Sequence, residues 1–178
     1  MKSYDYANRH GIVELSWESF ASLSRGLAEQ LADLGIDTVV GIARAGLLPA
    51  TAVACSLRCE MYPVRVTRRL DDEVRYDHPV WKVGVSPDVH GRRVAVIDEL
   101  ADSGETLALV AKEVRSLGAE KVVTVALASH SWASPMPDVS GLVSDALVVF
   151  PWDRRVLLGG EWKIHPELKE ALRLQEES

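Results

Sequence analysis

The sequence contains only two cysteines among its 178 residues. Cys55 and Cys59 are four residues apart, a spacing that could supply half of a metal site, but no CxxC or HxxxH pattern accompanies them. We therefore expect two small, reduced thiols in the protein core.

Long apolar runs are also missing. No stretch of about 18 consecutive apolar residues occurs, and Met1–Gly11 carries charges without the apolar segment of a signal peptide. We expect a cytoplasmic protein with no membrane partner.

Positive charge is not in excess. The chain has 20 Lys and Arg against 26 Asp and Glu, a formal net charge of -6. A nucleic-acid partner would therefore need a local basic patch, and a small ligand is the better expectation. The hydrophobic share of 47% and the charged share of 26% are ordinary for one globular domain.

The remaining pattern alternates strands with helices. Ser16 can cap a first helix that Gly35 can end, and apolar spacing predicts further helices at 47–57, 107–117 and 166–175. Apolar runs without alternation predict buried strands at 38–43, 61–67, 94–97, 121–128 and 145–150. This order indicates an α/β fold with a mainly parallel sheet and helices on both faces. Residues 68–92 are rich in charge and poor in periodicity, which predicts a long mobile loop with at most a short strand around 80–85.

One strand ends in two adjacent carboxylates, Asp98 and Glu99, which we expect in a turn at the carboxyl end of the strand, where open α/β sheets bind ligands. Such a pair can accept hydrogen bonds from a sugar diol or hold a divalent ion through oxygen. Residues 101–106, ADSGET, then place small side chains and backbone N–H groups at a helix N-terminus, a setting that favours phosphate. The alternative is a solvated acidic turn with a Ser/Thr cap.

Two other phosphate-linked folds do not fit. The Walker loop needs a lysine that ADSGET lacks. A receiver domain has its acidic pair near the N-terminus rather than in mid-chain.

The segment 94–106, VAVIDELADSGET, resembles the phosphoribosyl-diphosphate (PRPP) binding motif of type I phosphoribosyltransferases, with Glu99 in place of the commoner aspartate. The segment 41–50, GIARAGLLPA, resembles the family's pyrophosphate loop. The segment 148–153, VVFPWD, is similar to the PW[DE] segment of bacterial and archaeal purine enzymes of the hypoxanthine and xanthine-guanine type. The three segments occur in the family's order, and the resemblance covers roughly residues 36–155.

The resemblance implies a role for each matching residue. The ribose hydroxyls would bind Asp98 and Glu99, and Mg²⁺ would bind Asp98, Glu99 and Asp153. The 5′-phosphate would bind Ala101, Asp102, Ser103, Gly104, Glu105 and Thr106. The diphosphate would bind Arg44, Ala45, Gly46, Arg68 and Arg69, and the base would contact His130, Val149, Phe150 and Trp152.

Several of these side chains could instead have no ligand role. Arg44, Arg68 and Arg69 could be surface cations, and His130 a surface residue. Phe150 and Trp152 could be core aromatics.

The resemblance further implies a single domain, 1–178, with a core at about 36–128, a base-binding hood at about 129–165, and a homo-oligomer such as a dimer. The expected reaction transfers phosphoribosyl from PRPP to a nitrogenous base, preferably a purine, with release of diphosphate. Asp102 would be the catalytic residue and exchange a proton with N7 of the base, while residues 68–88 would close over the site.

One departure leaves the base open. The 6-oxopurine enzymes place a lysine where this chain has ASHSWASP, so His130 or a serine hydroxyl would have to donate instead. Two alternatives therefore stand beside the purine enzyme. One is a transferase with a non-purine acceptor; the other is a regulatory protein that senses PRPP or a nucleotide while binding nucleic acid, against which the missing basic face argues.

Overall fold

The computed structural model describes residues 11–70 and 73–176, and its contacts divide the chain into two compact units. The sheet unit comprises Ala21–Val143. The terminal unit comprises Met1–Phe20 together with Ser144–Ser178. The segment 129–143 was predicted to belong to the hood, but it lies in the sheet unit.

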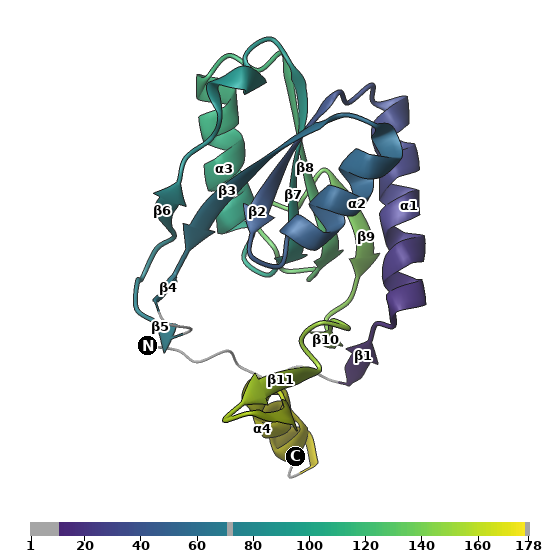
Figure 1. The fold of residues 1–178 in the computed structure, drawn as a ribbon, viewed down its shortest axis with the longest axis vertical. Coiled ribbons are helices and arrows are strands. Elements are labelled where there is room, and N and C mark those ends of the chain that lie inside the picture. The colour runs from purple at the N-terminus through teal and green to yellow at the C-terminus, as the bar shows by residue number, and fades with distance from the viewer. Residues whose placement is uncertain (1–10, 71–72, 177–178) are drawn as a thin grey trace. The chain divides into compact units, whose positions relative to one another are not determined.

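A six-stranded sheet in the order β6-β3-β2-β7-β8-β9 forms the centre of the sheet unit (Figure 1). All neighbouring pairs are parallel except β3 with β6 at one edge. The sheet therefore confirms the prediction of an α/β fold with a mainly parallel sheet. Its strands are β2 (Thr38–Ala43), β3 (Glu60–Thr67), β6 (Val80–Val83), β7 (Arg93–Ala101), β8 (Lys121–Ser129) and β9 (Val139–Val143).

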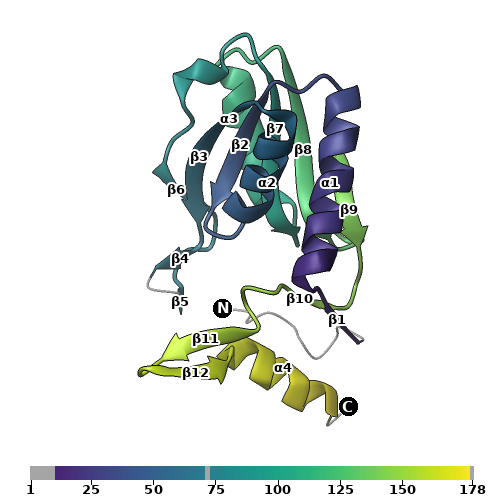
Figure 2. The same cartoon turned by 45° about the vertical axis from the view of Figure 1, so that its right-hand side comes forward.

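Helices cover both faces of this sheet, as the sequence predicts. Helix α2 (Leu47–Leu57) and the sheet-unit part of α1 (Trp17–Asp33) lie on one face, and α3 (Glu105–Ser116) lies on the other (Figure 2). The backbone N–H of Ser19 donates to Ser16 Oγ at 3.1 Å, so Ser16 caps α1 as expected. No helix in the described ranges is long and apolar enough to cross a membrane.

The core explains why the central strands are apolar without alternation. Val94, Val96 and Ile97 of β7 are completely buried, because helices cover both faces of the sheet. Val110 and Val114 of α3 are buried as well. Burying a side chain of this size stabilises the fold by about 1.5–3 kcal/mol.

Two sequence predictions about exposed segments need correction. The short strand expected around 80–85 is confirmed as β6, but the rest of 68–92 is not one long loop, because it also contains β4 (Arg69–Leu70), β5 (Glu73–Val74) and a 3₁₀ turn (Pro87–Val89). Strands of two residues are too short to show a period in the sequence. Of the two free thiols, Cys55 is exposed and Cys59 is half-buried, so neither is a core residue.

The terminal unit holds small elements of its own. Strand β1 (Ile12–Glu14) pairs in parallel with β10 (Leu147–Val149). The predicted strand at 145–150 therefore exists, but its partner is β1. A hairpin of β11 (Arg155–Leu158) and β12 (Glu161–Ile164) precedes helix α4 (Pro166–Glu176).

Candidate active site

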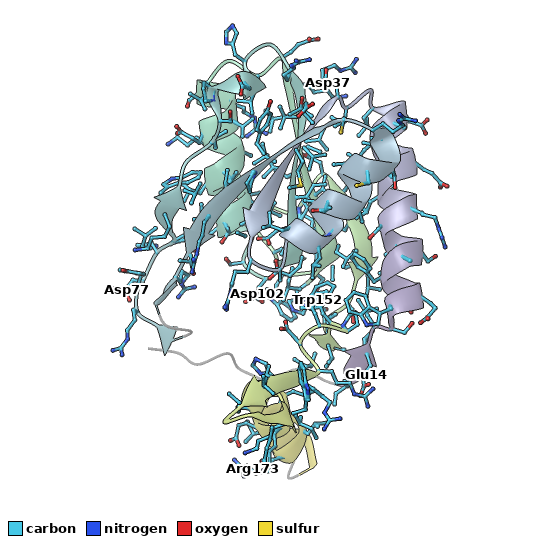
Figure 3. All side chains as sticks on the ribbon, in the orientation of Figure 1. Glu14, Asp37, Asp77, Asp102, Trp152 and Arg173 are labelled. Carbon is cyan, nitrogen blue, oxygen red and sulfur yellow. The ribbon has the colours of Figure 1, made fainter. Side chains whose placement is uncertain are left out.

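The predicted ligand residues of the sheet unit lie at the carboxyl-terminal end of the parallel strands, which we call the sheet edge of the site. Strands β2, β3, β7 and β8 are parallel, so they all end on this side, at Ala43, Thr67, Ala101 and Ser129. Figure 3 shows Asp102 at this end of the strands. Loops that follow such strand ends are the usual binding positions of open α/β sheets.

The acidic pair lies inside β7 and not in a turn after it. The strand continues to Ala101 because β8 still supplies partners, with Asp98 opposite Ala126 and Ala101 opposite Ser129. Asp98 is 8% exposed, and its Oδ1 accepts a hydrogen bond from the backbone N–H of Glu99 at 2.9 Å.

Burial changes the acidity of Asp98. It raises the pKa of the Asp98 carboxyl well above its usual value, and the neighbouring charge of Glu99 raises that pKa further. A ligand that brings hydroxyl donors or a cation to this pair would stabilise the ionised form.

A glycine brings the loop 44–46 against the acidic pair. A Cβ added at Gly46 would lie 2.7 Å from Asp98 Oδ1 and 2.5 Å from the carbonyl oxygen of Ile42. Only a residue without a side chain fits there, so Gly46 permits the close approach of this loop to β7. Arg44, which follows a cis peptide bond from Ala43, is exposed in the same loop. The structure thus joins two segments that lie about 50 residues apart in the chain.

Two backbone hydrogen bonds join the loop after β7 to the segment after β8. The backbone N–H of His130 donates to the carbonyl of Ala101 at 3.1 Å, and that of Ser134 donates to the carbonyl of Ser103 at 2.9 Å. These bonds turn two carbonyls of the loop toward residues 130–134. The first N–H groups of a helix have no partner within the helix, so the start of α3 can present donors to an anion.

Gly104 completes this arrangement. It begins α3 with a φ of 84°, a conformation that favours glycine, and a Cβ added there would collide with the carbonyl oxygen of Pro135. Beside it, Ser103 Oγ accepts a hydrogen bond from the backbone N–H of Glu105 at 3.3 Å. The absence of a side chain at Gly104 is thus required by packing and by its φ angle.

Asp102 has two aromatic neighbours from the segment after β8. Trp132 Nε1 donates to Asp102 Oδ1 at 3.2 Å, and His130 Nε2 lies 3.9 Å from the same oxygen. The rings of His130 and Trp132 are stacked, with centroids 4.4 Å apart and planes 16° from parallel. Sequence reasoning missed Trp132, although an aromatic residue within a run of turn formers was a signal.

Exposure distinguishes these two rings. His130 has no exposed surface, whereas Trp132 is 48% exposed. The alternative that His130 is a surface residue is therefore wrong. Its imidazole lies under the surface, and Trp132 is the larger side chain that this segment presents to solvent.

The predicted diphosphate arginines after β3 lie at the same sheet edge. Arg68 is exposed directly after β3, and its Nε donates to the carbonyl oxygen of Tyr76 at 3.4 Å. Arg69 begins β4. Because β3 neighbours β2 in the sheet, these residues follow the strand next to the one that leads into Arg44.

The terminal unit holds the other predicted base-binding residues. Phe150 and Trp152 stack on each other with centroids 5.0 Å apart, and Trp152 also packs edge to face with Phe20 at 5.5 Å. Val149 and Phe150 are buried. Packing therefore accounts for both aromatics, and a base contact for Val149, Phe150 or Trp152 stays a prediction.

The side chains of the described residues limit which metal ion could bind. Within residues 11–70 and 73–176, no three His, Cys, Asp or Glu residues are grouped so that they could hold one ion. Asp98 and Glu99 nevertheless offer two carboxylates. Mg²⁺ is commonly held by one or two carboxylates together with substrate phosphates, so the pair fits an ion that arrives with a phosphorylated ligand. Asp153 is exposed in the terminal unit, and its metal role stays a prediction.

Comparison with known proteins gives a family match. The model of the phosphoribosyl transferase domain matches residues 15–155. An adenine phosphoribosyltransferase from Alkaliphilus metalliredigens is 34% identical over 112 residues, which are 59% of this chain and 66% of that relative. The matched region therefore spans just under two thirds of that relative's length.

Other relatives carry different names. A xanthine-guanine phosphoribosyltransferase from Cereibacter sphaeroides is 31% identical over 78% of this chain and 85% of its own. A protein from Thermoplasma acidophilum named transcriptional regulator GfcR is 30% identical over 83% of this chain and 74% of its own. Among solved structures, a purine phosphoribosyltransferase from Pyrococcus horikoshii superposes with a TM-score of 0.71 and 31% identity, covering 79% of this chain and 93% of its own.

Proposed function

Because the chain belongs to the phosphoribosyl transferase domain family, we propose that it transfers the 5-phosphoribosyl group of PRPP to a ring nitrogen of a purine base. In this reaction the bond from ribose C1 to the diphosphate oxygen breaks, a C1–N bond forms, and the ring nitrogen loses its proton. The products are a nucleoside monophosphate and diphosphate. The observation that carries the proposal is the packing of Gly46 against Asp98, which sets the loop 44–46 beside the acidic pair.

Each part of PRPP has matching groups at the sheet edge. The carboxylates of Asp98 and Glu99 accept hydrogen bonds from the ribose hydroxyls. Backbone N–H groups and hydroxyls of residues 101–106 hold the 5′-phosphate at the start of α3. The loop 44–46 meets the diphosphate, with Arg44 as its cation and Arg68 and Arg69 as further predicted ligands.

The chain lowers the barrier chiefly by placing the reactants. Fixing both ends of PRPP holds ribose C1 in one position for attack by the base. The guanidinium of Arg44 opposes the charge that develops on the leaving diphosphate. Asp98 and Glu99 would hold Mg²⁺, which supplies further positive charge to the diphosphate when bound.

Asp102 is the proposed acid–base residue. It lies between Ala101 and Ser103, whose carbonyls accept hydrogen bonds from the segment after β8, and its side chain is 34% exposed. A carboxylate next to a bound phosphate is unfavourable unless it has a task of its own. Proton exchange with a ring nitrogen of the base is such a task.

The proposal names a class of acceptor base and not one base. No lysine occurs in residues 129–135, and the matched relatives are named for both adenine and xanthine-guanine. We therefore assign a purine as the class of acceptor. Contacts of the base with His130, Val149, Phe150 and Trp152, and the cytoplasmic, oligomeric protein expected from the sequence, remain part of the proposal.

A panel assay tests this function. The protein is incubated with PRPP, Mg²⁺ and adenine, hypoxanthine, guanine, xanthine or uracil in turn, and both diphosphate and nucleotide are measured. We expect nucleotide from at least one purine. Product from uracil alone would contradict the purine assignment and support the non-purine alternative.

One observation favours a second function. The relative named transcriptional regulator matches a large share of this chain, so a PRPP- or nucleotide-sensing regulator on the same fold is the alternative. Calorimetric binding of PRPP without product from any base in the panel would favour this alternative over the enzyme.

A further inference from the structure

Building on the proposed function, we infer that Trp132 is a positioning residue that orients the Asp102 carboxylate toward the acceptor base. The indole Nε1 donates to Asp102 Oδ1 at 3.2 Å. A donor on one carboxylate oxygen restricts rotation of the group and fixes the direction in which the other oxygen points. Trp132 thereby keeps Asp102 ready to take a proton from a ring nitrogen.

The backbone around this contact is fixed on both sides. His130 bonds to Ala101 and Ser134 bonds to Ser103, so one bond lies on each side of the Asp102–Trp132 pair. These two bonds hold the backbone of Asp102 and the backbone of Trp132 next to each other. The fold therefore brings the indole within hydrogen-bond reach of the carboxylate.

The ring of His130 stacks against the indole of Trp132 and supports its position. Its ring is fully buried and nearly parallel to the indole at 4.4 Å. Stacked aromatic rings attract each other beyond the effect of area burial. The imidazole thus supports the position of the indole by stacking against it.

The orientation of the Asp102 carboxylate matters because a bound 5′-phosphate would repel it. Asp102 belongs to the loop that would hold the 5′-phosphate, and a bound phosphate repels a nearby carboxylate. The indole N–H opposes this repulsion by holding Asp102 Oδ1. A misplacement of about 1 Å can lower turnover about 10²-fold.

The substitution Trp132→Phe isolates the N–H group, because phenylalanine retains an aromatic ring over His130. We expect kcat with the best purine to fall about tenfold, as for loss of a hydrogen bond to a charged group. The Kd for PRPP should stay within about twofold, since Trp132 acts on the acid–base step. The control for turnover is Glu113→Gln, which changes an exposed side chain of α3 and should leave kcat unchanged.

A double-mutant cycle tests whether Trp132 acts through Asp102. Asp102→Asn alone should lower kcat about 10²-fold or more. Adding Trp132→Phe to Asp102→Asn should then have almost no further effect, because the carboxylate to be oriented is gone. Equal fold losses from Trp132→Phe in both backgrounds, or a matching loss of PRPP affinity, would overturn the positioning role.

The contact itself can be read without turnover. The indole N–H NMR signal that disappears in Trp132→Phe should shift in Asp102→Asn and stay in place in Trp162→Phe. An unmoved signal in Asp102→Asn would overturn the inference. Absence of product from the wild-type protein with every base is a different result, because it would overturn the proposed transfer reaction itself.

Discussion

At the scale of single residues, the buried carboxyl of Asp98 couples stability to pH. Its pKa is raised in the folded protein, mainly by burial, so the folded state holds its proton more tightly than the unfolded state. The stabilising effect of this proton is complete below the unfolded pKa of about 3.9 and is lost as pH rises through the raised folded pKa. Above that pKa the charged group destabilises the fold.

Asp98→Asn should therefore raise the free energy of unfolding at neutral pH, and the gain should vanish toward pH 4. Asparagine keeps an oxygen that can accept the N–H of Glu99. Urea unfolding of both proteins from pH 4 to pH 8, without PRPP or divalent cations, measures the difference. A variant less stable than wild type at neutral pH would contradict the prediction.

Asp98 and Glu99 together should also determine the affinity for PRPP. Asp98→Asn combined with Glu99→Gln should weaken PRPP about 10²-fold or more, because two contacts to charged groups are each worth about 1.5–3 kcal/mol. Calorimetry with PRPP and Mg²⁺ measures this loss. The control Glu113→Gln removes an exposed carboxylate from α3 and should bind PRPP normally. Unchanged affinity in the double variant would rule out the ribose assignment.

At the scale of elements, the junction of the loop 44–46 with β7 depends on close backbone approach. Gly46→Ala places a Cβ where Asp98 and the carbonyl of Ile42 already lie, while its φ of -61° is allowed for alanine. We expect a loss of stability of about 1–3 kcal/mol from overpacking, and at least tenfold weaker diphosphate binding. Gly26→Ala in α1 is the control, since nothing lies within 4 Å of its added Cβ. Diphosphate affinity equal in both variants would contradict the role of this junction.

The two phosphate-binding loops should also be separable. Arg44→Ala should weaken PRPP and diphosphate while sparing a nucleoside monophosphate, because the 5′-phosphate is assigned to residues 101–106 at the start of α3. Titration of the three ligands into wild type and variant compares them directly. Similar losses for all three would place Arg44 elsewhere on the ligand.

At the scale of the whole molecule, net charge separates the enzyme from the regulator. With a formal charge of -6, the chain should bind duplex DNA or RNA more weakly than the about 10⁻⁴–10⁻⁶ M typical of non-specific binding by basic proteins. Fluorescence anisotropy with labelled duplexes at 0.15 M salt, with and without PRPP, tests this. Micromolar binding that responds to PRPP would support the regulator instead.

Much of the sheet unit could be predicted from local patterns. The strand at 38–43 and the helix at 47–57 appear with the predicted limits, because apolar runs and helical spacing reflect burial on both faces of a sheet and on one face of a helix. The segment ADSGET was predicted to precede a helix, and α3 does begin directly after Gly104. Sequence motifs thus predicted which residues to consider for the candidate site, and their binding roles stay predictions.

Only the tertiary structure decided how those residues meet. The approach of Gly46 to Asp98 and the hydrogen bond from Trp132 to Asp102 join residues 30 or more positions apart, and no local period encodes such distances. The pairing of β10 with β1 has the same origin, because a three-residue strand carries no information about its partner. Burial of His130 and the raised pKa of Asp98 likewise arise from packing by distant segments, which local sequence does not specify.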